Sequence, residues 1–258
     1  MNSAVLPRLA RAYAPVAVAL LGLVLACLLA PAPAGAQSVN LDLGDGVGTT
    51  GRVVQLVVLL TVLSLAPSII IMVTSFTRIV VVLSFLRSAL GTQQTPPNTV
   101  LVSLALFLTA FVMAPTIENA WNQGLKPLLA EEITEEVAFE RTSGPVRDFM
   151  LAHVRENDLR LFMDLAKAEP VAEPAAMPLR ILVPAFMISE LRRAFEIGFL
   201  LFVPFVVIDM VVASVLMSMG MMMLPPTALS LPFKLIFFVL VDGWRLVSGS
   251  LAQGFALG

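Results

Sequence analysis

Residues 220–244 read GMMMLPPTALSLPFKLIFFVLVDGW, and this stretch decides how the rest of the chain is interpreted. A glycine and the pair Pro225 and Pro226 break the chain between two long apolar tracts. Three consecutive methionines lie in the break, and methionine adapts its shape to whatever presses on it. Irregular backbone at membrane depth survives only where it is buried in protein or lines a cavity. The stretch therefore favours a compliant lining on a passage over a catalytic centre.

Methionine is concentrated at the start of this stretch, where Met217, Met219, Met221, Met222 and Met223 fall within seven positions. Three interpretations compete for them. Lipid-facing or core filler is the plainest, and it suits a single methionine. A Cu(I) thioether site is the second, but no cysteine or histidine lies nearby to assist it. A compliant constriction is the third, and the flanking glycine and prolines favour it because they predict a loop.

The composition is that of an integral membrane protein. Of the 258 residues, 58% are hydrophobic and only 13% are charged, about half the charged share of a soluble domain. The mean hydropathy is +0.92. The formal net charge of −2 provides no bulk attraction for nucleic acid. We therefore expect a polytopic helical protein in contact with membrane lipid, with no nucleic-acid partner.

The N-terminus has the pattern of a cleaved secretory signal peptide, residues 1–36. Two arginines precede an apolar core over 14–30, and a small-residue site follows it, with cleavage between Ala36 and Gln37. An uncleaved anchor is the alternative, but this core is shorter than the ~20 residues of a span. The only cysteine, Cys27, lies in the core, and its acylation is a minor alternative. Cleavage after Ala36 leaves no disulfide and no thiol chemistry.

Apolar tracts and polar stretches divide the rest of the chain into four regions. A flexible, glycine-rich exported tail covers 37–52, and a first pair of apolar helical segments covers 53–116. Clustered acids and intermittent apolar residues at helical spacing predict a small exported α-helical domain at 117–180. A second pair of apolar helical segments, joined by the methionine loop, covers 181–258.

Prolines predict where these segments break or kink. Pro67 is expected to interrupt the first tract, which we divide into a span at about 53–73 and a helical extension. Residues 91–98 are expected to be a turn before a second span at 99–116. Pro184 and Pro204 are candidate kinks in the third tract. The segments are thus expected to form kinked helical hairpins.

The signal peptide sets the expected topology. With an exported N-terminus, four spans place the segment 78–98 in the cytoplasm, where its two arginines satisfy the positive-inside rule. The acidic region 117–180 then lies outside, and the fourth span also ends outside.

The residues argue against catalysis. His153 is the only histidine, and without a cysteine or histidine companion it argues against a zinc site. No serine-hydrolase, zinc-protease or phosphate-loop motif occurs. An intramembrane aspartyl protease needs two membrane aspartates, and Asp209 and Asp242 do not form a catalytic-looking pair. We expect no enzymatic activity, no catalytic residue, no metal and no cofactor.

Asp209 is the most informative single charge, because it lies in the apolar run 203–217. A carboxylate inside a membrane is costly and is functional by default. The alternative is a structural residue that bonds to backbone or to Lys234. The structural interpretation is favoured, because the apolar tracts are too long to lie wholly within lipid. A proton relay stays open.

Other charges are placed to pair on helix surfaces, where residues three or four positions apart are neighbours. Such pairs would fix helix register within the membrane-type segments. The pairs with this spacing are Asp242 with Arg245, Glu190 with Arg193, and Arg192 with Glu196. Lys234 and Asp242 are eight positions apart and are expected to share a helix face across two turns.

Two stretches resemble signatures of the FliP family. They are PAFMISELRRAFEIGF at 184–199 and PFKLIFFVLVDGW at 232–244. The resemblance covers the chain from about residue 53 onward, and the signal peptide is similar to that of the flagellar branch. The motif residues are Pro184, Phe186, Glu190, Phe195, Gly198, Phe199, Pro232, Lys234, Asp242, Gly243 and Trp244.

The resemblance implies a pore-forming core subunit of the flagellar type III protein export gate. Such a subunit passes unfolded flagellar proteins across the inner membrane and templates rod assembly. It implies an all-α, polytopic fold that assembles into an oligomeric pore of five copies with FliR and FliQ subunits, beside other membrane proteins of the export apparatus. The location implied is the bacterial inner membrane and the flagellar basal body, with a periplasmic domain.

Particular residues take roles under this resemblance. Met221, Met222 and Met223 would form a pore gasket that limits leakage. Phe149, Phe162 and Glu190 are candidate subunit contacts.

Three alternatives remain beside the export gate. A small-molecule or ion transporter would need a polar site at mid-membrane, for which only Asp209 is a candidate. A membrane scaffold without a pore fits the composition alone. A virulence type III secretion homologue would form the same kind of gate.

Overall fold

A computed structural model describes residues 49–92, 94–168, 177–221 and 225–256 of the chain. Within these ranges all regular structure is helical, which confirms the all-α prediction. The signal peptide, its cleavage site at Ala36 and Gln37, and two methionines of the loop, Met222 and Met223, lie outside the described residues. The chain divides into two units, Met1–Val57 and Val58–Gly258. Of the first unit, the structure describes only the start of one helix.

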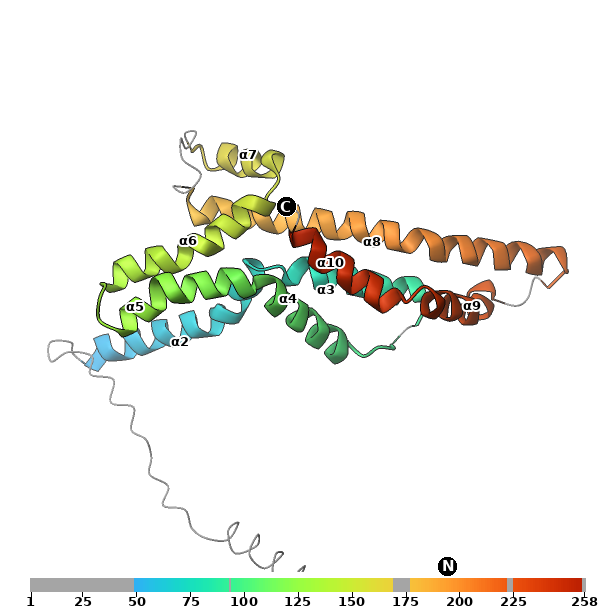
Figure 1. Ribbon diagram of the computed structural model, residues 1–258, viewed down its shortest axis with the longest axis horizontal. Helices are drawn as coiled ribbons and strands as arrows, with labels where there is room; N and C mark the ends of the chain where they lie inside the picture. The colour runs from blue at the N-terminus through green and yellow to red at the C-terminus, as the bar shows by residue number, and fades with distance from the viewer. Residues whose placement is uncertain (1–48, 93, 169–176, 222–224, 257–258) are drawn as a thin grey trace, which may run out of the picture. The chain divides into compact units, whose positions relative to one another are not determined.

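Figure 1 shows the helices in chain order, coloured from blue to red. They are α2 (Thr49–Met72), α3 (Phe76–Leu90), α4 (Asn98–Ala120), a π-helix η1 (Trp121–Leu125), α5 (Lys126–Leu129), α6 (Glu135–His153), α7 (Glu156–Leu165), α8 (Leu179–Ser218), α9 (Pro226–Leu240) and α10 (Gly243–Ala256).

Helix α3 is the centre of the main core. It packs along α8 and beside α4 (Figure 1). On α8, a Cβ at Gly198 would lie 2.6 Å from Cδ2 of Phe85, so the two helices approach closely only because that position is glycine. Apolar residues of α3 recur every three or four positions, as one buried helix face requires. The buried ones are Phe76, Ile79, Val82, Leu83, Leu86, Ala89 and Leu90.

A second core lies where α6 and α7 meet the first turns of α8. Met150 of α6 is fully buried there against Ile181, Leu182 and Phe186 of α8. Val73, just after α2, packs against the same cluster. The chain therefore holds α6 and α7 on α8 through its own apolar contacts.

Three helices are long and apolar enough to cross a membrane, at Val53–Met72, Asn98–Leu129 and Leu179–Ser218. The pair α9 and α10 passes the same test together but bends by 61°. The count is thus three or up to four by length and composition, and four spans were expected. The predicted single final tract is two helices, because the chain turns at Asp242, whose φ is 52°.

The break predicted at Pro67 is wrong, because Pro67 lies inside a continuous α2. The first tract breaks between Met72 and Phe76, next to residue 73, where the first span was expected to end. Pro184 and Pro204, expected as kinks, lie inside α8, which runs for 40 residues without a break. In apolar helices, neighbouring groups and local adjustments satisfy the backbone that proline frees, so proline need not end the helix. Helix α4 likewise continues past the predicted end of the second segment to Ala120.

The predicted separation of the Arg78 segment from the 117–180 region is also wrong. The Arg78 guanidinium stacks on Phe255, and the Phe255 ring in turn stacks on Phe149 of α6. Since these groups lie together, a bilayer cannot separate them. The far end of α3 lies elsewhere, next to α9, where Lys234 reaches the carbonyl oxygen of Ala89.

Candidate functional site

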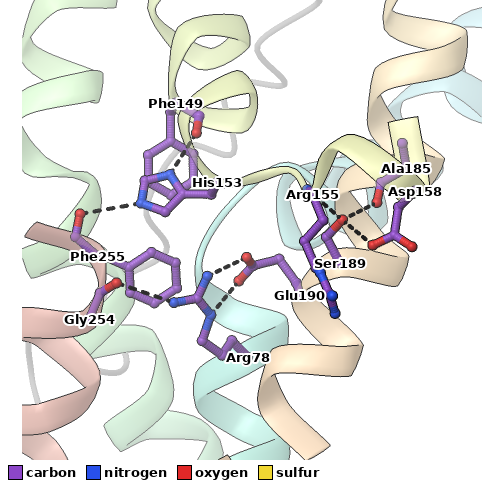
Figure 2. Close-up of polar contacts among 10 residues, drawn as sticks. All are labelled: Arg78, Phe149, His153, Arg155, Asp158, Ala185, Ser189, Glu190, Gly254 and Phe255. Atoms are coloured by element: carbon purple, nitrogen blue, oxygen red, sulfur yellow. Dashed lines mark hydrogen bonds and ion pairs between the residues drawn. The ribbon is translucent and has the colours of Figure 1, made fainter. Parts of the chain in front are cut away.

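A fully buried ion pair joins α3 to α8. The Arg78 guanidinium donates from Nε to Oε2 of Glu190 at 2.8 Å and from Nη2 to Oε1, as Figure 2 shows. The two side chains are 3% and 0% exposed. Burial lowers the pKa of Arg78, and the hydrogen bond and charge of Glu190 oppose that shift. Two parallel charge-assisted bonds make this pair strong and directional.

The C-terminal turn of α10 closes the same pair. Nη1 of Arg78 donates to the carbonyl oxygen of Gly254 at 3.5 Å. The guanidinium carbon lies 3.7 Å from the centroid of the Phe255 ring, a cation–π contact. Arg78 therefore ties three helices together: α3, α8 and α10.

His153 at the end of α6 contacts the same turn of α10. Its Nδ1 lies 2.7 Å from the carbonyl oxygen of Phe149, and its Nε2 lies 3.3 Å from that of Phe255 (Figure 2). The imidazole packs against both the Phe149 and Phe255 rings, whose centroids are 4.6 and 5.2 Å away. The lone histidine is thus a buried contact between α6 and α10.

Ser189 of α8 anchors the start of α7. It accepts a hydrogen bond from the backbone N–H of Arg155 at 3.0 Å. Its hydroxyl lies 2.7 Å from Oδ2 of Asp158 and 2.9 Å from the carbonyl oxygen of Ala185 (Figure 2). The neighbours Ser189 and Glu190 therefore hold two different helices onto α8.

A second buried charge cluster lies near the other end of α3. Nζ of Lys234 on α9 donates to Oδ2 of Asp209 on α8 at 2.7 Å and to the carbonyl oxygen of Ala89 at 3.2 Å. Ser230 donates its hydroxyl to the other carboxylate oxygen of Asp209. The pairing that the structural interpretation of Asp209 required is therefore present. Lys234 and Ser230 bind both oxygens of the carboxylate that a transported solute would need, so the transporter alternative is not favoured.

The expected ion pairs are partly confirmed. Arg192 and Glu196 pair at 3.1 Å on the surface of α8. Asp242 and Arg245 lie 3.9 Å apart and are exposed. The expectation that Lys234 and Asp242 share a helix face is wrong, because a helix break separates them and Lys234 binds Asp209. The pairing of Glu190 with Arg193 is wrong, because Arg78 takes the carboxylate.

The motif residues divide into a buried and an exposed set. Inside the chain they position helices: Phe186, Glu190, Gly198, Lys234 and Gly243 are buried, and Pro184 is half-buried. The other motif residues are exposed on the surface of the single chain. Phe199 is 69% and Phe195 57% exposed, and Pro232, Asp242 and Trp244 are exposed as well.

The methionine loop begins at a defined helix end. Gly220 has a φ of 75°, which favours glycine, and its N–H donates to the carbonyl oxygen of Met217 at 3.1 Å. Met217, Met219 and Met221 all expose their side chains. Helix α9 begins after the loop, at Pro226. The described part of the loop thus presents thioether side chains at the tip of the α8–α9 hairpin.

The candidate subunit contacts take part in packing within the chain. Phe149 is half-buried and meets Phe186 edge-on at 5.9 Å. Phe162 is half-buried beside the second core. Glu190 is fully buried and has no exposed atoms with which to touch a partner directly.

Two open apolar grooves run along the far half of α8. One of about 640 Å³ lies between α8 and α9 and includes Val211, Leu229 and Phe233. The other, of about 570 Å³, includes Phe85, Phe195 and Phe199. Across the described ranges, no group of three or more histidine, cysteine, aspartate or glutamate residues is placed to hold a metal.

Sequence reasoning missed Arg78 and the contact of His153 with α10. Both depend on partners far away in the chain: Arg78 and Glu190 are 112 residues apart. The available signal was an arginine flanked by long apolar runs, since such a charge needs a buried partner.

Comparison with known proteins gives one family. The model of the FliP family matches residues 59–251. The chain is 66% identical to the flagellar biosynthetic protein FliP of Caulobacter vibrioides, over 91% of this chain and 88% of the relative. It is 54% identical to that of Rhizobium meliloti, over 86% and 93%. It is 55% identical to that of Bacillus subtilis, over 78% and 91%.

Proposed function

Because the chain belongs to the FliP family and is a component of the export apparatus of flagellar type III secretion, we propose that it is the pore-forming core subunit of that apparatus. In this role it passes unfolded flagellar proteins across the bacterial inner membrane and provides the base on which the rod assembles. The proposal gives it no enzymatic activity and no cofactor.

The apolar surface that the single chain leaves uncovered is the observation that carries this proposal. In the apolar window of α2 no residue is buried, and in that of α8 only 6% are. The two grooves on α8 are lined almost wholly by apolar side chains. Contiguous apolar surface of this kind needs lipid or other subunits to cover it. Assembly into a ring of five copies with FliQ and FliR subunits would bury it, and lipid would cover the rest.

The methionine loop supports a pore because of where it lies. It joins α8 and α9 at the tip of a hairpin, and unbranched thioether chains can reshape around whatever passes. Met221, Met222 and Met223 are proposed as one subunit's share of a gasket that limits leakage. An Ala substitution of all three should raise ion leak through the assembled gate. An unchanged leak in the triple variant removes the gasket role.

The remaining assignments follow the same proposal. The helical region 117–180 is proposed to lie on the periplasmic side of the inner membrane, within the flagellar basal body. Phe149 and Phe162 stay candidates for subunit contact. Glu190 is proposed to act indirectly, by keeping α3 on α8 so that the contact surface has its shape.

The mass and symmetry of the solubilised particle test the proposal. The chain is expressed with its FliQ and FliR family partners, extracted in detergent and weighed by native mass spectrometry. Five copies of this chain in one particle are expected. A particle with one or two copies that moves a small solute across vesicle membranes contradicts the proposal.

A further inference from the structure

Both ring nitrogens of His153 face carbonyl oxygens. Nδ1 lies 2.7 Å from the oxygen of Phe149, and Nε2 lies 3.3 Å from the oxygen of Phe255 (Figure 2). A carbonyl oxygen only accepts hydrogen bonds, and a neutral imidazole has a single N–H to donate. Only the doubly protonated ring can therefore make both bonds. In the neutral ring, one nitrogen lone pair points at an oxygen.

The acceptor on the α10 side is the negative end of a helix. Gly254 and Phe255 lie in the last turn of α10, which ends at Ala256. The carbonyl groups of a last turn have no partner within the helix and carry the negative end of its dipole. Arg78 already takes the oxygen of Gly254, at 3.5 Å. His153 is the second donor at this helix end, and a positive charge on it suits the site.

The charged groups around the ring are compatible with a positive charge on His153. From α3, Arg78 stacks on the far ring of the cluster, Phe255, and from α8 Glu190 pairs with Arg78 directly. On α6, two acids and two bases line the same groove as His153: Glu140, Arg141, Arg147 and Asp148. From α4 and η1, the groove is lined by the uncharged residues Thr116, Asn119 and Gln123. From α10, the last turn brings carbonyl groups and no charged side chain.

A polar groove of about 790 Å³ gives the ring access to protons. Helix α4, η1 and α6 line it, and His153 lies along its wall. Its other polar residues include Asn119, Gln123 and Glu140. The residue His153 itself is only 4% exposed, so the groove supplies the route by which a buried imidazole exchanges its proton with water.

We propose that His153 is a pH-dependent latch that holds the C-terminal end of α10 against α6. The latch is closed when the ring carries two protons and donates to both carbonyl oxygens. As the pH rises the ring loses a proton. With one proton the ring keeps the shorter bond, from Nδ1 to the oxygen of Phe149, and gives up the 3.3 Å bond to Phe255, so the end of α10 loosens. The inference rests on contacts within this chain and does not depend on the export role proposed above.

Hydrogen exchange followed by mass spectrometry tests the latch on the full chain in its purified complex. Exchange is measured between pH 5.5 and 8.5, with labelling times scaled for the intrinsic pH dependence of amide exchange. Peptides from 243–256 should exchange about tenfold more slowly at the low end of this range, the size expected for one hydrogen bond to a charged group. Peptides from the middle of α4 serve as the internal control and should not change.

Two variants assign the effect to the ring. His153→Gln keeps a polar side chain that cannot be charged, and His153→Phe keeps the aromatic packing against Phe149 and Phe255. Neither variant should show the pH dependence, and His153→Phe, which has no donor for the Phe255 carbonyl oxygen, should exchange α10 amides at the fast rate throughout. An absence of pH dependence in the unmodified chain overturns the latch, as does a pH dependence that persists in either variant.

Discussion

The two buried ion pairs on α8 differ in how completely the chain encloses them. Arg78 and Glu190 are joined by two parallel bonds and are 3% and 0% exposed, with α10 closing the site. Lys234 and Asp209 share a single bond, and the Asp209 side chain is 28% exposed. All partners of Arg78 and Glu190 lie within this chain, and the pair holds α3 and α10 on α8. The second pair is left partly open beside a bare apolar groove, as expected of a surface that assembly completes.

This difference predicts the largest effect at Glu190. Glu190→Gln keeps the shape but removes the charge, so the Arg78 guanidinium stays buried without a counter-ion. Breaking a buried pair in this way costs about 3–5 kcal/mol. The loss should appear as a lower free energy of unfolding in detergent titrations.

A double variant separates the cost of an uncompensated buried charge from the cost of changed packing at these two positions. Arg78→Met with Glu190→Leu replaces the pair by apolar groups and leaves no buried charge, an exchange that is often nearly neutral. It should be more stable than Glu190→Gln alone. Equal losses in the two variants would mean that packing, and not the uncompensated charge, sets the cost.

A smaller effect is expected at the open pair. Asp209→Asn keeps a hydrogen-bond partner for Ser230, and Lys234 retains the carbonyl oxygen of Ala89. Because the carboxylate is partly exposed, its charge is screened, and the loss should be about 1 kcal/mol. The same detergent titration measures it.

Export by the assembled gate distinguishes the two interpretations of Asp209. If the residue is structural, gates assembled from the Asp209→Asn variant should export at a near-normal rate. Normal assembly with export abolished would instead support a proton relay. Lys234→Gln changes the other member of the pair. If the pair is structural, both variants should lose a similar, modest amount of unfolding free energy.

The sequence predicts features that depend on neighbouring residues better than features that depend on residues far apart in the chain. Long apolar tracts predict the helices well, because length and hydropathy are local properties. The break expected at Pro67 was wrong, because that proline lies inside α2. The rule that proline ends a helix comes from soluble proteins and is weaker in apolar segments.

Spacing predicts charge pairing only between residues within four positions of each other, and the pair of Asp209 with Lys234 was named only as one structural alternative. Arg192 with Glu196 follows from spacing, and so does the loose contact of Asp242 with Arg245. The partner of Glu190 does not, because spacing favours Arg193 on the same helix. Burial decides instead: an arginine in the most buried helix must find a carboxylate, wherever that carboxylate lies in the chain.

The smallest effect should come from the exposed pair on the same helix as both buried ones. Arg192 and Glu196 are 57% and 56% exposed, and an exposed pair four residues apart on a helix contributes about 0.3–0.5 kcal/mol. Arg192→Ala should therefore change the free energy of unfolding of the solubilised chain by no more than that, and by less at high salt. Alanine is a slightly better helix former than arginine, so propensity offsets part of this small loss and does not add to it. A loss above about 1 kcal/mol in the assembled particle, but not in the single chain, would mean that a neighbouring subunit covers this face of α8.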